Sequence, residues 1–157
     1  MDRPLVAVLD TNVVVSVFLN PGGTPARILA SLDSKTYVAA FDARIIAEYR
    51  AVLLRPRFGL ASQDVQRFVK EFMTRGWPVE PALWSGAMVD ESDRTFVEVA
   101  LAASAILVTG NARHFPQEPW VKTPSAFWAM LTGVGTVGVT EGTVRVVTWS
   151  LVKTGST

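Results

Sequence analysis

The amino-acid sequence predicts an α/β fold in which a central parallel sheet is covered by helices. Residues 6–10 form an apolar run that ends in the carboxylate of Asp10, which is typical of a strand buried on both faces of a parallel sheet. Residues 106–109 form a second such strand. Between the predicted strands, apolar residues recur at helical spacing. This repeated order of strand, loop and helix indicates parallel βαβ units with right-handed crossovers.

Length and composition narrow the class of protein. The 157 residues are enough for one domain with an ordinary core. The absence of cysteine excludes disulfides, thiolate catalysis and zinc–cysteine sites, and the single histidine, His114, excludes multi-histidine metal sites. Any metal must therefore be held by oxygen atoms, which favours Mg²⁺ or Mn²⁺. Since the net charge is only +1, contact with a nucleic acid would need a local basic patch.

The distribution of apolar residues predicts a cytoplasmic protein with no membrane partner. Charges, prolines or glycines interrupt every apolar run before the ~18 residues that a membrane span needs. Asp2 and Arg3 lead directly into the first strand, so no signal peptide is expected. The lack of cysteine agrees with a reducing compartment.

Capping residues and prolines delimit the elements of the first half of the chain. Thr24 and Pro25 are expected to open one helix, and Asp42 to cap the next. Ser62 and Asp64 should start a third helix. The predicted strands cover residues 6–10, 37–40 and 77–79, and the helices cover residues 26–33, 43–54 and 63–75.

The second half begins with residues 81–89, which carry little pattern and predict a loop with Trp84 exposed. Asp90 and Asp93 crowd the start of the next helix, where acids are favoured by the helix dipole whatever their function. We expect the inner face of this helix to comprise Phe96, Val97, Ala100, Leu101 and Ala103. Strands over residues 106–109 and 121–122 follow, and Thr123 with Pro124 opens a last helix.

Polar groups collect where the predicted strands end. Asp10 with Thr11 and Asn12 is either a functional site or a helix cap, and Asn111 follows the strand at 106–109. Ligands of parallel sheets bind at the carboxyl ends of the strands. These residues are therefore candidates for one shared site.

Four motifs then carry a resemblance to a known family. They are L-D-T-N-V-V-V-S at 9–16, A-E-Y-R-A-V-L-L-R-P-R-F at 47–58, D-E-S-D-R-T-F-V-E-V-A-L-A at 90–102 and L-V-T-G-N-A-R-H-F at 107–115. In order and spacing, from Leu5 to about Leu131, they resemble a PIN domain, and most closely the bacterial PIN proteins regarded as toxins of toxin–antitoxin systems. The resemblance implies a three-layer α/β/α sandwich and a metal-dependent ribonuclease with acids at the carboxyl edge of the sheet.

Carried over by position, the resemblance implies that Asp10, Glu48 and Asp93 are the catalytic acids and metal ligands. Asn111 stands where many relatives have a fourth acid. An amide oxygen can ligate a metal but adds no charge, which predicts weaker metal binding. We expect Asp10 and Asp93 to ligate directly, Glu48 to ligate a second ion or position the attacking water, and Asn111 to complete the coordination.

Further residues are candidates for supporting roles. Thr11, Asn12 and Ser16 are expected to hydrogen-bond the ligands or the scissile phosphate. Asp90 is either an additional ligand or an N-cap. Arg94 and Arg113 flank the motif positions and are candidates for phosphate contacts, although each is equally typical of a solvated surface.

The sequence therefore favours an endoribonuclease that hydrolyses RNA phosphodiester bonds, as the toxin of a pair whose antitoxin covers the acidic cleft. The alternative is a non-catalytic RNA-binding PIN module in which Asn111 marks a decayed site. A DNA nuclease of the flap type would need long insertions that this chain lacks. The expected organisation is a PIN-like domain over residues 1–132, a C-terminal extension over residues 133–157 that forms a strand, a hairpin or a disordered tail, and a homodimer through the helices at 43–54 and 63–75 or the extension.

Overall fold

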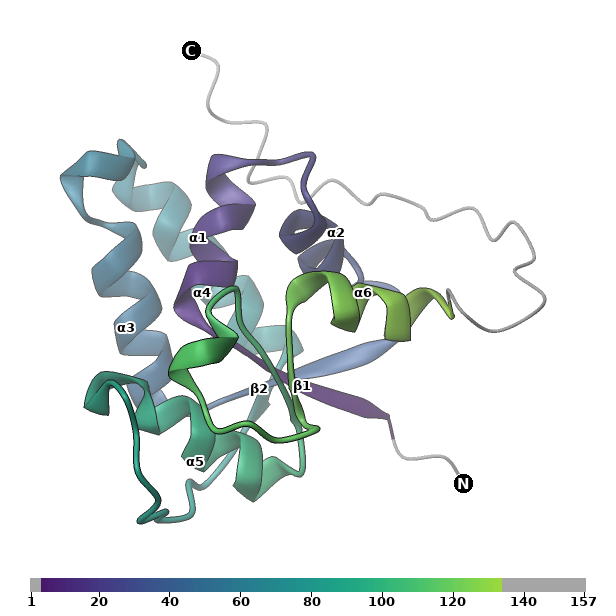
Figure 1. Cartoon of the computed structure of the whole chain (residues 1–157). Coiled ribbons are helices and arrows are strands. Elements are labelled where there is room, and N and C mark those ends of the chain that lie inside the picture. The colour runs from purple at the N-terminus through teal and green to yellow at the C-terminus, as the bar shows by residue number, and fades with distance from the viewer. Residues whose placement is uncertain (1–3, 134–157) are drawn as a thin grey trace.

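A computed structural model describes residues 4–133 of the chain and shows five parallel strands in one sheet, ordered β3-β2-β1-β4-β5 (Figure 1). The strands are β1 Leu5–Leu9, β2 Tyr37–Phe41, β3 Trp77–Pro78, β4 Ile106–Val108 and β5 Val121–Lys122. The α-helices are α1 Thr11–Leu19, α2 Thr24–Ala30, α3 Ala43–Leu53, α4 Ser62–Arg75, α5 Arg94–Ala103 and α6 Pro124–Thr132. In Figure 1, α1, α2 and α6 lie above the strands and α5 lies below them. The predicted three-layer fold with a central parallel sheet is confirmed.

Strand β1 lies at the centre of the sheet because its side chains are apolar in both directions. Four of its five residues are buried, and Ala7 pairs with Ala39 of β2 on one side and with Ile106 of β4 on the other. The ladder continues past the strand, since the Asp10 N–H donates to the Val108 carbonyl at 2.9 Å. The backbone of Asp10 is therefore fixed between the ends of β1 and β4.

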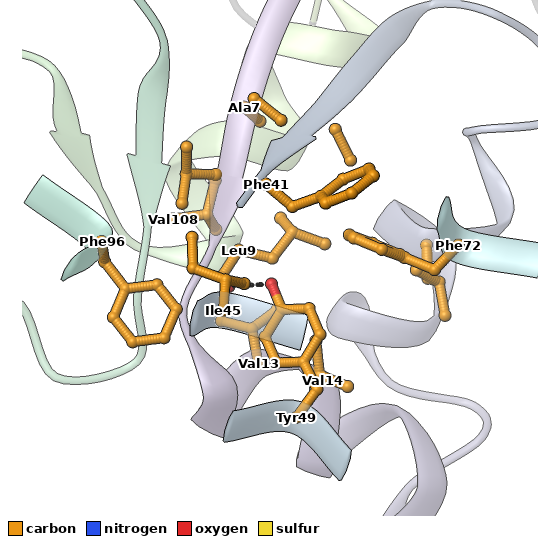
Figure 2. Close-up of a cluster of buried hydrophobic side chains, with 14 of the residues drawn as sticks. Ala7, Leu9, Val13, Val14, Phe41, Ile45, Tyr49, Phe72, Phe96 and Val108 are labelled. Carbon is orange, nitrogen blue, oxygen red and sulfur yellow. Dashed lines mark hydrogen bonds between the residues drawn. The ribbon is translucent and has the colours of Figure 1, made fainter. Parts of the chain in front are cut away.

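The core beside β1 joins the sheet to α3 and α4. Tyr49 of α3 is fully buried, and its hydroxyl donates a hydrogen bond to the Leu9 carbonyl (Figure 2). The ring of Phe72 in α4 lies 5.4 Å from the Tyr49 ring and 5.9 Å from the Phe41 ring, between ring centroids. These contacts fix the distance of α3 from the end of β1.

Several local predictions are confirmed. The Asp42 carboxylate accepts a hydrogen bond from the Ile45 N–H at 2.9 Å and caps α3, and the Thr123 hydroxyl accepts from the Ala126 N–H at 3.2 Å and caps α6. Two predicted helix starts are wrong by one or two residues. Helix α2 starts at Thr24 with Gly23 as its N-cap, because the extended Gly23 offers its carbonyl to the Arg27 N–H. Ala61 occupies the N-cap position of α4 without any side-chain hydrogen bond.

The prediction for the inner face of α5 is also partly wrong. Leu101 is 40% exposed, whereas the charged residue Glu98 is buried. Trp84 is half-buried and packs against the core, where the sequence predicted an exposed side chain. The Glu98 carboxylate accepts a hydrogen bond from the Trp84 N–H at 3.0 Å, which holds the segment around Trp84 against α5.

Two further expectations concern the limits of the described chain. The predicted boundary at residue 132 stays a prediction, since the extension over residues 133–157 lies outside the described residues apart from Gly133. Among residues 4–133, no single helix is long and apolar enough to cross a membrane. Helices α1 and α2 together have the length and composition of a bent span, and their buried residues belong to the hydrophobic core.

Gly76, which ends α4, is expected to be intolerant of a side chain. A Cβ at this position would lie 2.6 Å from the Ala39 carbonyl oxygen and 2.8 Å from a ring carbon of Phe41. Gly76→Ala should therefore lower the free energy of unfolding by about 1–3 kcal/mol, measured by urea denaturation. Gly22→Ala is the matched control, since a Cβ there meets nothing within 4 Å. Equal effects of the two substitutions would contradict the close packing of α4 on β2.

Candidate active site

Asp10 is the most constrained carboxylate at the carboxyl edge of the sheet. It is 6% exposed and occupies the N-cap of α1, where its Oδ1 accepts a hydrogen bond from the Thr11 N–H at 2.7 Å. Its Oδ2 accepts a second hydrogen bond from the Thr109 hydroxyl at 2.8 Å. The cap and the site interpretations of Asp10 are thus compatible, because the residue that caps α1 also lies at the end of the central strand.

The surroundings of Asp10 disfavour its charged form. Burial raises its pKa from 3.8 to about 6, and the negative charges of Asp93 and Glu48 contribute to the rise. The hydrogen bonds from Thr109 and Thr11 act in the opposite direction, because they stabilise the carboxylate. A carboxylate in this position would be stabilised by a cation.

Glu48 reaches the same place from helix α3. Its side chain is half-buried, and its Oε2 accepts a hydrogen bond from the Thr11 hydroxyl. Thr11 therefore bonds to Asp10 through its backbone and to Glu48 through its side chain. The neighbouring Tyr49 attaches this turn of α3 to the Leu9 carbonyl.

Asp93 lies at the end of the 3₁₀ helix η2 (Glu91–Asp93), directly before α5. It has the N-cap position of α5, yet its side chain makes no capping hydrogen bond. Its carboxylate is half-buried, and burial followed by the charges of Asp90 and Glu48 raises its pKa. The nearby His114 has a smaller, opposite effect. Asp93 is thus electrostatically coupled to both Glu48 and Asp10.

Asn111 is connected to Asp10 through Thr109. The Asn111 N–H donates to the Thr109 hydroxyl oxygen at 2.9 Å, and that hydroxyl donates in turn to Asp10. Thr109 is fully buried and was missed as a site residue by the sequence analysis. A signal was available, because a hydroxyl residue directly follows the apolar run of β4. Its significance depends on β4 lying next to β1, which the sequence pattern does not specify.

The other two candidates of the D-T-N-V-V-V-S motif differ in their position. The Asn12 side-chain oxygen accepts a hydrogen bond from the Gly110 N–H at 3.2 Å and so attaches the loop after β4 to α1. The Ser16 hydroxyl donates to the Asn12 backbone carbonyl at 2.8 Å, a bond within its own helix. The structure therefore connects Asn12 to the loop at the site and gives Ser16 a contact inside α1.

The additional charged candidates have local partners. Asp90 accepts hydrogen bonds from both the N–H and the hydroxyl of Ser92, which is the cap geometry that the sequence left as one alternative. Arg94 forms a two-pronged pair with Glu91 and donates to the Trp84 carbonyl at 2.7 Å. Arg113 is exposed at the rim. Of the two arginine candidates for phosphate contacts, Arg94 is thus engaged within the chain.

The donor set suits a hard divalent cation in its chemistry. Asp10, Glu48 and Asp93 offer carboxylate oxygens, Asn111 offers an amide oxygen, and the repulsion among the acids would be relieved by a positive charge. Among residues 4–133, however, no three acidic or histidine side chains are close enough together to form a ready metal cage. Joint binding of one cation therefore requires these side chains to move closer together.

Comparison with known proteins identifies the family. A family model described as the PIN domain matches residues 6–113. The chain belongs to the PIN domain family. The match covers every site residue named above, from Asp10 to Asn111 and Arg113.

Two similar proteins extend the comparison. An uncharacterised protein of the archaeon Methanocaldococcus jannaschii is 29% identical over 107 residues, which cover 66% of this chain and 69% of that protein. The crystal structure of VapBC2 from Rickettsia felis, bound to a DNA fragment from its promoter, includes a chain that superposes with a TM-score of 0.54 at 18% identity. That match covers 76% of this chain and 97% of the other, and it shows a shared PIN fold. Since one relative is archaeal, the bacterial subgroup stays a prediction.

The raised pKa of Asp10 predicts a pH-dependent stability in the presence of EDTA. Because the folded state keeps a proton that the unfolded state releases near pH 3.8, the free energy of unfolding falls as the pH rises from 3.8 to about 6 and then levels off. The shift corresponds to a loss of at most about 3 kcal/mol. Asp10→Asn should remove this loss, as measured by urea denaturation at about pH 4 and about pH 7. An unchanged pH dependence in the variant would contradict the assignment.

Proposed function

We propose that this PIN protein is a divalent-metal-dependent endoribonuclease that hydrolyses RNA phosphodiester bonds. One observation carries the proposal: Asp10, Glu48 and Asp93 come from three distant segments and are electrostatically coupled at the carboxyl edge of the sheet. Repulsion among the acids costs stability in the folded protein unless a cation lies between them, and acids perturbed in this way cluster at functional sites. Membership of the PIN domain family supports nuclease activity in general. The three acids are the basis for proposing that this activity depends on a divalent metal.

The proposed roles follow from the position of each group. Asp10 and Asp93 would hold Mg²⁺ or Mn²⁺, Glu48 would hold a second ion or orient the attacking water, and Asn111 would contribute its amide oxygen. A bound divalent cation supplies the charge that offsets the phosphate and the acidity that activates a water. Thr109 and Thr11 orient the carboxylates of Asp10 and Glu48 by their hydrogen bonds.

The proposed biological role is that of a toxin with an antitoxin partner. The resemblance of the motifs to PIN toxins supports it, and so does the shared fold with a chain of the VapBC2 complex. In this proposal the antitoxin covers the acidic edge. In the same proposal, the RNA substrate would be bound by exposed arginines, among them Arg50, Arg55 and Arg113.

A specific observation supports a second candidate function. Asn111 gives the site one charge fewer than a set of four acids, and no ready metal cage is present among residues 4–133. A non-catalytic RNA-binding module would have these properties. The retention of Asp10, Glu48 and Asp93 favours the enzyme, because an RNA-binding surface gains nothing from three coupled acids.

Cleavage of a mixed RNA pool in Mn²⁺ tests the proposal. Asp93→Asn should lower the rate at least ~100-fold, since even residues that only orient metal ligands contribute 10-fold to 100-fold. Its melting temperature should change little, because Asp93 makes no capping hydrogen bond. Glu118→Gln, which alters an exposed carboxylate before β5, is the control and should cleave like the wild type.

Asn111→Asp distinguishes the two candidate functions. For an enzyme with weakened metal binding, the added charge should lower the Mn²⁺ concentration for half-maximal cleavage. RNA binding without cleavage in both the wild type and Asn111→Asp, at any Mn²⁺ concentration, would support the non-catalytic module and refute the nuclease.

We also propose a homodimer. Apolar side chains are exposed on or next to the predicted contact helices, with Leu54 after α3 39% exposed and Met73 of α4 44% exposed. In the proposed dimer, Leu54 and Met73 would belong to one contiguous apolar contact, which is the kind of surface that marks association sites. Light scattering at micromolar concentration should give about twice the 17.1 kDa chain mass, and Met73→Glu should reduce it. A wild-type species of one chain mass would refute the homodimer.

A further inference from the structure

Glu98 is a carboxylate within the buried part of α5. Phe96 to Ala100 are all buried, and Glu98, which is 4% exposed, is the charged residue among them. A buried charge is costly unless it is paired and hydrogen-bonded. The hydrogen-bond partners of Glu98 therefore explain how its charge is accommodated inside the fold.

Both oxygens of the Glu98 carboxylate have a partner from a different segment. Oε1 accepts a hydrogen bond from Arg44 Nη1 of α3 at 2.8 Å, and Oε2 accepts from the Trp84 N–H at 3.0 Å. The Arg44 contact is the main reason that the pKa of Glu98 lies below its ordinary value. Glu98 thus joins α5 to α3 and to the loop before η2.

Arg44 extends this connection to the start of α3. Its Nε donates to Asp42 Oδ2 at 2.7 Å, while Asp42 Oδ1 caps the helix. One guanidinium therefore holds the first turn of α3 against the middle of α5. Lysine has a single terminal nitrogen and would not reproduce this two-pronged contact.

The Arg44–Glu98 ion pair joins α3, which carries Glu48, to α5, which begins directly after Asp93. Arg44 and Glu48 are four residues apart on α3, and so lie on one side of that helix. Asp93 lies directly before α5, one turn and a half ahead of Glu98. The relative position of Glu48 and Asp93 thus depends on how α3 sits against α5.

A second branch of the same network reaches the residues beside Asp93. Trp84, bonded to Glu98 through its N–H, accepts a hydrogen bond from Arg94 Nη1 through its carbonyl, and the Arg94 guanidinium lies 5.4 Å from the centre of the Trp84 ring. Arg94 also pairs with Glu91 in η2. Arg94, which follows Asp93, and Glu91, which precedes it by two residues, are therefore connected to the Arg44–Glu98 pair through Trp84.

We propose that Arg44 and Glu98 are positioning residues, which set the separation of Glu48 and Asp93 for joint binding of a divalent cation. This inference rests on the proposed function. An apolar pair would fill the space that Glu98 and the inner part of the Arg44 side chain occupy, but it would not impose a fixed geometry on the two helices. The charged pair is therefore expected to matter more for the site than for the stability of the fold.

The test measures Mn²⁺ binding by isothermal titration calorimetry, together with melting temperature and RNA cleavage. The variants are Glu98→Gln and the double variant Arg44→Met, Glu98→Leu. The control is Asp33→Leu, Arg75→Met, which removes an ion pair between the residues that follow α2 and the end of α4, where the chain enters the amino end of the sheet. If Glu98→Gln fails to fold, the double variant decides, because it removes the Glu98 carboxylate and the Arg44 guanidinium together, while Asp42 keeps its hydrogen bond from the Ile45 N–H.

The positioning role predicts about tenfold weaker Mn²⁺ binding in both Glu98 variants. The Mn²⁺ concentration for half-maximal cleavage should rise in parallel, and the rate at saturating Mn²⁺ should recover. The control variant should bind Mn²⁺ like the wild type even if its melting temperature falls. Wild-type Mn²⁺ affinity in the double variant would overturn the proposal and leave the nuclease assignment intact. A wild type that binds no Mn²⁺ would refute the nuclease assignment and this inference together.

Discussion

The structure depends on the placement of one carboxylate, Asp10, between the ends of the two central strands. Its N–H continues the ladder to β4, its Oδ1 begins α1, and its Oδ2 is held by the buried hydroxyl of Thr109. Burial, together with the charges of Asp93 and Glu48, raises the pKa of Asp10 to about 6, although the hydrogen bonds from Thr109 and Thr11 lower it. A carboxylate whose ionisation is made costly by burial and by two neighbouring acids is poorly suited to a purely structural role, because a neutral asparagine or serine also caps a helix.

The other parts of the candidate site are arranged around this carboxylate by ordinary packing. The Tyr49 hydroxyl and the ring contacts of Phe72 hold α3 against the end of β1, so that Glu48 reaches Thr11. Helix α5, which lies below the strands in Figure 1, begins directly after Asp93, whose charge acts on Asp10 at the end of β1. The core therefore determines which acids meet, and the polar contacts determine how they are oriented.

Much of the fold was predictable from the sequence because its signals are local. The apolar runs of β1 and β4 and the caps Asp42 and Thr123 each depend on a few adjacent residues. The resemblance to PIN domains supplied Glu48, which no local pattern separates from a surface glutamate.

The remaining features were not predictable because they depend on contacts between distant segments. Thr109 reaches Asp10 only because β4 lies beside β1. In the sequence Glu98 resembles any exposed glutamate of a helix, and only the folded structure shows that Arg44 and Trp84 donate hydrogen bonds to it. In the sequence Arg94 resembles an exposed arginine that is available to a phosphate. In the structure its guanidinium donates hydrogen bonds to Glu91 and to the Trp84 carbonyl. In each case the decisive partner lies in another element or loop.

We propose that Asp10, Glu48 and Asp93 form one cation-binding unit, in which Asp10 is partly protonated near pH 6. The most direct test is calorimetric titration of Mn²⁺ near pH 6 and near pH 8, each in two buffers of different ionisation enthalpy. Because a metal displaces the proton from its ligand, binding near pH 6 should release about half a proton per chain, and binding near pH 8 almost none. Asp10→Asn should abolish the proton release. Failure of the wild type to bind Mn²⁺, or binding without any proton release near pH 6, would contradict the account.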